Sequence, residues 1–86
     1  MKPLKLVLYT KPDCALCEPF KKAVYAVCMS FRWKNKITFS EINIESDPVY
    51  SERFGEKIPC LTINDKLCAK YKIEKKELQR KLKEAF

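Results

Sequence analysis

The pattern of apolar and polar residues divides the first part of the chain into a strand, a turn and a helix. Residues 4–9 are apolar apart from Lys5, which is typical of a strand buried on both faces. Residues 10–13 include Pro and Asp, which favour a turn. Apolar residues then recur every three or four positions up to Lys34–Lys36, which predicts an amphipathic helix ending there. Its buried face is expected to comprise Phe20, Ala23, Val24, Val27, Cys28 and Phe31.

The middle of the chain predicts a second strand and a short helix. Residues 37–44 alternate between apolar and polar side chains, as expected of a strand. Asp47 and Pro48 are residue types that begin helices, as N-cap and as first helical residue. The helix should run to about Phe54, because Gly55 is a residue type that follows helix ends.

The last third of the chain predicts a hairpin and a final helix. Residues 61–63 and 66–68 are short strands around Asn64-Asp65, two residues that tolerate positive φ in a tight turn. A helix from about Ile73 follows, with an outer face rich in Lys and Glu. Its inner face is expected to comprise Leu78, Leu82, Ala85 and Phe86.

This order, β-α-β-α-β-β-α, predicts an α/β fold. The first two strands, joined through a helix, should be parallel with a right-handed crossover. We expect a four-stranded mixed sheet flanked by three helices, two on one face and one on the other. The chain has 86 residues, so residues 1–86 are expected to form one domain.

Cys14 and Cys17 lie between the first predicted strand and the first predicted helix. A cysteine there meets unpaired backbone N–H groups and the positive end of the helix dipole, which favour the thiolate. This strand–turn–helix placement of C-x-x-C is the thioredoxin-like one. We predict that Cys14 attacks a disulfide and that Cys17 resolves the resulting mixed disulfide. A reduced structural pair and half of a metal site remain alternatives.

Two charged neighbours have opposite effects on the Cys14 thiolate. Lys11, three residues earlier, would stabilise a thiolate and attract an anionic substrate, although a solvated loop lysine explains it equally well. Asp13 places a carboxylate beside Cys14, which disfavours the thiolate.

The other three cysteines do not belong to a recognisable motif. Cys28 is expected to be a small core residue, and Cys68 to be half-buried. Cys60 would lie near the Cys14–Cys17 turn if the third strand begins at Pro59, and a redox or metal role stays open for it. The chain has no His, which excludes Cys-His and Ser-His-Asp catalysis and histidine-supported zinc.

Two segments of the chain resemble the glutaredoxin family of the thioredoxin superfamily. Residues 8–17, Leu-Tyr-Thr-Lys-Pro-Asp-Cys-Ala-Leu-Cys, are similar to the family's Y-T-K-x-x-C-x-x-C segment. Residues 58–66, Ile-Pro-Cys-Leu-Thr-Ile-Asn-Asp-Lys, are similar to V-P-x-x-x-I-x-G-K, in which the proline is cis. The resemblance implies a minimal thioredoxin fold, a cis bond before Pro59, and pairing of the Ile58 backbone with a bound thiol peptide.

The resemblance also implies a function. We expect a thiol–disulfide oxidoreductase acting on protein disulfides or glutathione mixed disulfides, restored by a thiol reductant, with glutathione as a possible co-substrate and no tightly bound cofactor. Its potential should lie between roughly −270 and −200 mV. Glutaredoxins carry Pro-Tyr or Pro-Phe between the cysteines and a glycine pair with an Asp after the hairpin. Here Ala15-Leu16 and the segment 68–72, Cys-Ala-Lys-Tyr-Lys, stand at those places.

Two other classes of protein remain possible. One is an iron–sulfur or zinc carrier that uses Cys14, Cys17 and perhaps Cys60, which would purify coloured or zinc-loaded. The other is an interaction module that keeps the fold without turnover, as the missing glycine pair would allow.

The composition bears on partners and location. The net charge is +7, which fits a solvated surface or an anionic partner. No set of base-stacking aromatic residues accompanies the lysines, so no nucleic acid is expected as a partner. No run is long enough to span a membrane, and no secretory signal pattern is present. We therefore expect a monomer in the cytosol, where cysteine pairs are more often catalytic or metal-binding than structural.

Overall fold

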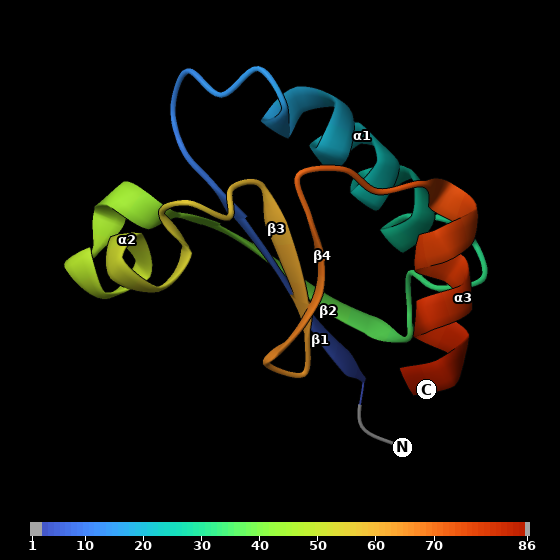
Figure 1. The fold of residues 1–86 in the computed structure, drawn as a ribbon. Helices are drawn as coiled ribbons and strands as arrows, with labels where there is room; N and C mark the ends of the chain where they lie inside the picture. The colour runs from blue at the N-terminus through green and yellow to red at the C-terminus, as the bar shows by residue number, and fades with distance from the viewer. Residues whose placement is uncertain (1–2, 86) are drawn as a thin grey trace.

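The computed structural model describes residues 3–85, which form a mixed sheet with helices on both faces (Figure 1). The elements follow one another in the predicted order. They are β1 (Leu4–Thr10), α1 (Cys17–Cys28), β2 (Ile37–Asn43), a short 3-10 turn η1 (Ile44–Ser46), α2 (Pro48–Phe54), β3 (Cys60–Ile63), β4 (Lys66–Lys70) and α3 (Lys75–Ala85).

The described residues contain a four-stranded sheet in the order β2-β1-β3-β4. β1 pairs in parallel with β2 and antiparallel with β3, and β3 pairs antiparallel with β4. The apolar run at the start of the chain thus becomes an inner strand, covered on both faces as its pattern predicts. Asn64 and Asp65 have φ of 50° and 69°, which confirms the tight turn between β3 and β4.

Two apolar clusters show how the helices cover the sheet. Phe20 and Val24 of α1 and Leu78 of α3 share one cluster with Leu6 and Leu8 of β1. Phe54 of α2 belongs to a second cluster with Val7 and Tyr9 of β1. Since alternate residues of β1 point to opposite faces, α1 and α3 cover one face and α2 the other, as predicted and as Figure 1 shows.

The predicted end of the first helix is wrong. α1 ends at Cys28, because the chain turns at Met29 and Ser30, and the Ser30 hydroxyl donates to the carbonyl of Val27 at 2.7 Å. Phe31 is therefore 92% exposed instead of buried. Trp33, which was not predicted to be in the core, takes a buried position beside α1 after this turn.

Smaller differences occur at three other boundaries. Ile44 is buried but lies in η1 and not in β2, because Asn43 accepts a hydrogen bond from the Glu45 N–H and starts the 3-10 turn. Ile73 is buried in the loop before α3, which begins two residues later than predicted. Ala85 is exposed because it borders an open pocket between the end of α3 and the β3–β4 hairpin, and Phe86 lies outside the described residues.

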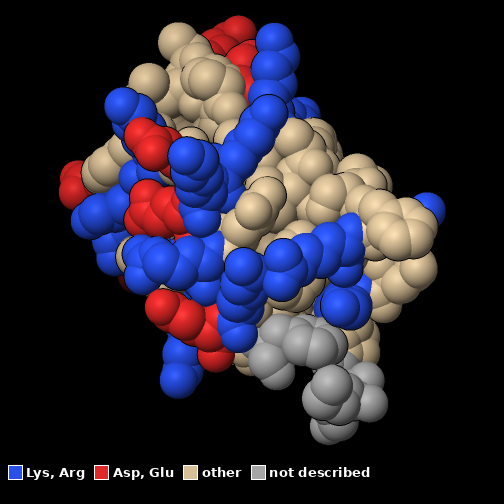
Figure 2. All heavy atoms as spheres, turned by 90° about the vertical axis from the view of Figure 1, so that its right-hand side faces the viewer, with Lys and Arg blue, Asp and Glu red and all other residues tan. Residues whose placement is uncertain are grey.

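The outer face of α3 is charged, as its sequence predicts. Figure 2 shows Lys and Arg side chains interspersed with Asp and Glu on the side of the molecule that α3 occupies. Arg80 pairs with Glu84 and Lys81 with Glu77, each one helical turn apart. The exposed Arg80–Glu84 pair contributes little to stability, whereas Lys81 is partly buried and also donates to the Cys68 carbonyl at 2.7 Å.

Candidate functional site

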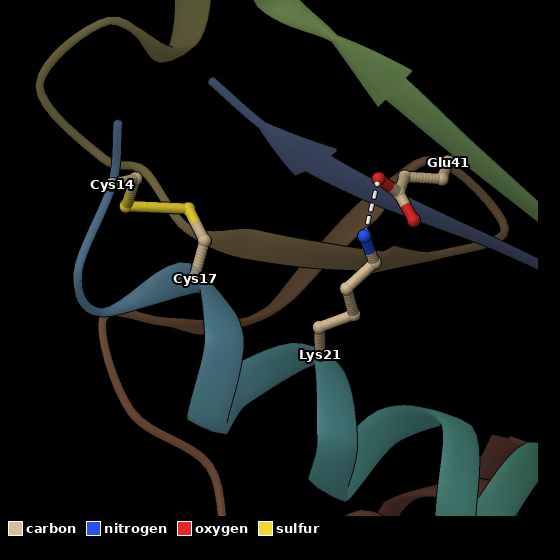
Figure 3. The surroundings of a disulfide bond; sticks show 4 residues. All are labelled: Cys14, Cys17, Lys21 and Glu41. Carbon is tan, nitrogen blue, oxygen red and sulfur yellow. Dashed lines mark ion pairs between the residues drawn. A yellow bond between two sulfur atoms is a disulfide. The ribbon is translucent and has the colours of Figure 1, made fainter. Parts of the chain in front are cut away.

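A disulfide joins Cys14 to Cys17 where the chain passes from β1 into α1 (Figure 3). Their Cα atoms are 5.3 Å apart, and the Cys17 N–H donates to the Cys14 carbonyl at 3.2 Å. α1 begins at Cys17, and its N-cap residue Leu16 has no side chain that accepts a hydrogen bond. The pair therefore lies at the positive end of the helix, as predicted.

The two cysteines differ in exposure. Cys17 is 6% exposed and belongs to the apolar cluster around Phe54. Cys14 is only partly buried and packs against that cluster from the preceding turn. This difference agrees with the predicted order, in which the outer sulfur meets a substrate first.

Ile58 and Pro59 lie beside the cysteines. The peptide bond between them is cis, as the resemblance implies. Ile58 is buried in the same apolar cluster as Cys17, so residues more than forty positions apart in the sequence are brought to one place. The predicted roles of Ile58 in binding substrate and of Pro59 in shaping the substrate groove stay predictions.

A polar pocket of about 290 Å³ opens next to the disulfide, and both cysteines line it. Lys11 lines it as well and is exposed; its role as a supporting charge stays a prediction. Sequence analysis did not assign three further charged residues of this pocket, Glu18, Lys21 and Glu41, to the site.

Lys21 and Glu41 face each other across this pocket from α1 and β2 (Figure 3). The Lys21 ammonium is 3.1 Å from the Glu41 carboxylate, to which the Tyr25 hydroxyl also donates at 2.6 Å. Lys21 lies one helical turn after Cys17, and that spacing was a signal in the sequence. No sequence signal indicated Glu41, since its position near the cysteines depends on its pairing with Leu8 in the parallel register of β1 and β2.

Opposing effects set the ionisation of Glu41. Burial raises the pKa of the carboxyl, but the hydrogen bonds from Tyr25 and Lys21 outweigh burial, so the pKa lies below its usual range. The hydrogen bond that Tyr25 donates to Glu41 also raises the pKa of the Tyr25 hydroxyl to about 12. At neutral pH the pocket thus holds a carboxylate and an ammonium close together beside the disulfide.

The remaining cysteines are free thiols. Cys28 is a core residue and Cys68 is half-buried, as predicted. Burial raises the pKa of Cys28 and of Cys60 to about 11, and burial also raises the pKa of Cys68. Cys60 shares the apolar cluster of Cys17, so it lies near the disulfide even though β3 begins at Cys60 and not at Pro59.

Residues 3–85 lack two other features. No group of three or more His, Cys, Asp or Glu side chains is arranged to hold a metal ion in this range, so the metal-carrier alternative gains no supporting observation. Over the same residues, none of the helices has the length and apolar character needed to cross a membrane.

Comparison with known proteins places the chain in a family. Residues 5–83 match the model of the Glutaredoxin-like domain (DUF836), and the chain belongs to this family. A Dictyostelium discoideum protein named as glutaredoxin-like is 28% identical over 79 residues, which cover 90% of this chain and 73% of the relative.

Solved structures agree on the fold. A protein from X. campestris superposes with a TM-score of 0.73 at 21% identity, covering 94% of this chain and 99% of the other. The germline-specific thioredoxin Deadhead of Drosophila melanogaster superposes with a TM-score of 0.72 at 12% identity, covering 99% of this chain and 83% of the other. The described residues therefore have the thioredoxin fold.

Proposed function

We propose that this protein is a thiol–disulfide oxidoreductase in which Cys14 is the nucleophile and Cys17 the resolving thiol. The observation that carries the proposal is the Cys14–Cys17 disulfide at the start of α1, with Cys14 partly exposed and Cys17 buried. The glutaredoxin-like family and the thioredoxin fold support it.

The reaction exchanges one disulfide for another. The Cys14 thiolate attacks one sulfur of the substrate disulfide, and the other sulfur leaves as a thiolate that takes a proton from water. Cys17 then loses its proton and attacks the Cys14 sulfur of the mixed disulfide. The second substrate thiol leaves, the Cys14–Cys17 disulfide forms, and two electrons have passed to the substrate. An external thiol reductant restores the dithiol.

The residues around the disulfide have distinct tasks in this proposal. Lys11 and Lys21 supply positive charge to the pocket that both cysteines line. Glu41 fixes the Lys21 ammonium through their 3.1 Å ion pair and offsets part of its charge. Ile58 and Pro59, buried beside Cys17, form the wall along which the substrate chain lies.

Trapping of the mixed disulfide tests the order of the two thiols. The reduced Cys17→Ser variant, mixed with a peptide disulfide, should accumulate a covalent adduct of one peptide thiol on Cys14, visible by intact-mass spectrometry. Cys14→Ser should form none at the same concentration. An adduct of equal yield on Cys17 in the Cys14→Ser variant would contradict the assignment.

A further inference from the structure

A second pocket, of about 300 Å³, lies on another side of the cysteine turn and is mainly apolar. It is formed by two segments that are far apart in the sequence. The turn and the first helical residues contribute Leu16, Pro19 and Phe20, and the loop between β4 and α3 contributes Tyr71, Lys72 and Ile73. In Figure 1 this loop passes beside the start of α1.

Part of this apolar surface is open to solvent. Leu16 is 53% exposed and Tyr71 is 42% exposed, whereas Phe20 is 2% exposed and forms the floor. A concave, mainly apolar pocket with a single charged residue in its lining has the character of a site that binds an apolar group. None of the residues that line this pocket is a cysteine or a carboxylate, so it is separate from the polar pocket that holds Glu41.

Tyr71 is held firmly as one wall of the pocket. Its φ is 66°, a conformation that a residue other than glycine adopts at a cost of about 1–2 kcal/mol. Its N–H donates to the Pro59 carbonyl at 2.7 Å, and its hydroxyl donates to the Glu56 carbonyl. The Lys70 ammonium lies 5.6 Å from the centre of its ring. The wall is therefore preformed, which lowers the entropic cost of filling the pocket.

We propose that this pocket binds an apolar side chain of the polypeptide whose cysteine Cys14 attacks, and that Lys72 pairs with a carboxylate beside that side chain. The inference rests on the proposed function and names its substrate class. Lys72 is the charged residue of the pocket lining, so an acidic neighbour complements it. Leu16, which lines the pocket, is two residues from Cys14, so the bound side chain belongs to a residue close in sequence to the target cysteine.

This chemistry favours protein disulfides over glutathione mixed disulfides. Glutathione consists of a γ-linked glutamate, a cysteine and a glycine, so it offers no apolar side chain to the pocket. Tyr71 lies in the segment where glutaredoxins have a glycine pair, and its side chain fills space that glycine would leave empty. Tyr71 is thus a specificity-determining residue in the proposal.

Matched peptides test the pocket without altering the protein. Three peptides, Gly-Cys-Gly-Leu-Glu, Gly-Cys-Gly-Ser-Glu and Gly-Cys-Gly-Leu-Gln, are each joined through their cysteine to a coloured aromatic thiol. Reduced wild-type protein releases the coloured thiol at a rate that depends on the peptide. We expect the first peptide to react about tenfold or more faster than the second, because apolar pockets discriminate by about this factor per methylene or more. Equal rates within twofold would overturn the proposal.

Charge reversal at Lys72 tests the acidic neighbour. Lys72→Glu should abolish or reverse the preference for the Glu peptide over the Gln peptide. Lys66→Glu is the matched control, because it makes the same change of net charge at an exposed position at the other end of β4. It should leave the preference for the Glu peptide over the Gln peptide unchanged. An equal effect of both variants would assign the preference to net charge and overturn the pairing with Lys72.

Failure of the proposed function would look different from failure of the pocket. If all three peptides react at one rate and Cys14→Ser abolishes it, the oxidoreductase stands and the pocket inference is wrong. If no peptide reacts, the proposed function fails.

The pocket is then tested by a binding measurement that needs no reaction. Peptides with Ser in place of Cys are titrated into labelled protein while the Tyr71 and Ile73 amide signals are followed by NMR. Shifts caused by the Leu peptide but not by the Ser peptide would support the pocket, and no shifts would overturn it.

Discussion

Removing the charge of Glu41 should make the Cys14 thiolate more abundant. The Lys21 ammonium and the Glu41 carboxylate, 3.1 Å apart, both line the pocket of the cysteines and act on a thiolate there with opposite signs. Glu41→Gln removes one repulsive charge and leaves the Lys21 ammonium without its ion-pair partner. The equilibrium between thiol and thiolate then shifts towards the thiolate.

The pocket gives the size of this effect. Its volume of about 290 Å³ equals that of a sphere roughly 8 Å across, and two unit charges at that distance interact by about 0.5 kcal/mol in water and about 2 kcal/mol at an effective dielectric constant of about 20. These energies correspond to a rise in the thiolate-to-thiol ratio of about two- to thirty-fold. The carboxylate is partly exposed, so the lower half of this range is expected.

Thiolate absorbance near 240 nm, followed against pH in the Cys17→Ser background, measures the ratio. Burial raises the pKa of Cys28 and Cys60 to about 11 and also raises the pKa of Cys68, and the variant with Ser at both positions 14 and 17, titrated in parallel, gives the absorbance of these three thiols. Lys21→Met should lower the ratio, the double variant should return close to wild type, and Glu52→Gln, the same charge change on α2, should have little effect. An unchanged or lower ratio in Glu41→Gln would refute the reasoning that Glu41 offsets positive charge at Cys14.

Further predictions concern stability. Leu78→Ala should lower the free energy of unfolding by about 2–5 kcal/mol in urea denaturation, because Leu78 is fully buried, whereas Phe31→Ala at a 92% exposed position should change it by less than about 0.5 kcal/mol. Tyr25→Phe should cost about 1 kcal/mol, because it removes a hydrogen bond to a partly exposed carboxylate. The folded pKa of Glu41 is lowered, so its stabilisation is present above the unfolded pKa and lost as pH falls through the folded value. The difference in unfolding free energy between wild type and Glu41→Gln should therefore shrink on acidification, and a difference that persists at low pH would contradict this assignment.

The sequence predicted those parts of the fold in which local pattern and tertiary structure agree. The apolar run of β1 and the Asn64-Asp65 turn are confirmed because burial on both faces and positive φ each require particular residue types. The Phe31 prediction failed because helical spacing continues in the sequence after the backbone has left the helix at Met29. Spacing alone does not show where the chain turns.

The site was predictable only in part, for a similar reason. Cys14 and Cys17 are neighbours in the sequence, and helix geometry fixes their relation. The cis bond before Pro59 came from family resemblance and not from local chemistry. Glu41 reaches the pocket through the register of two parallel strands, and Tyr71 lines its pocket through a loop that returns to α1. Both contacts are long-range, so no local pattern contains them.

The most direct test of the account is the reduction of a protein disulfide under multiple turnover. Wild type, Cys14→Ser and Cys68→Ser are compared with insulin as substrate and a thiol reductant, and the glutathione mixed disulfide is measured alongside. The account predicts turnover by wild type and by Cys68→Ser, which changes a free cysteine outside the disulfide, and none above background by Cys14→Ser. Turnover that survives in Cys14→Ser, or wild type that is inert towards both substrates, would contradict it.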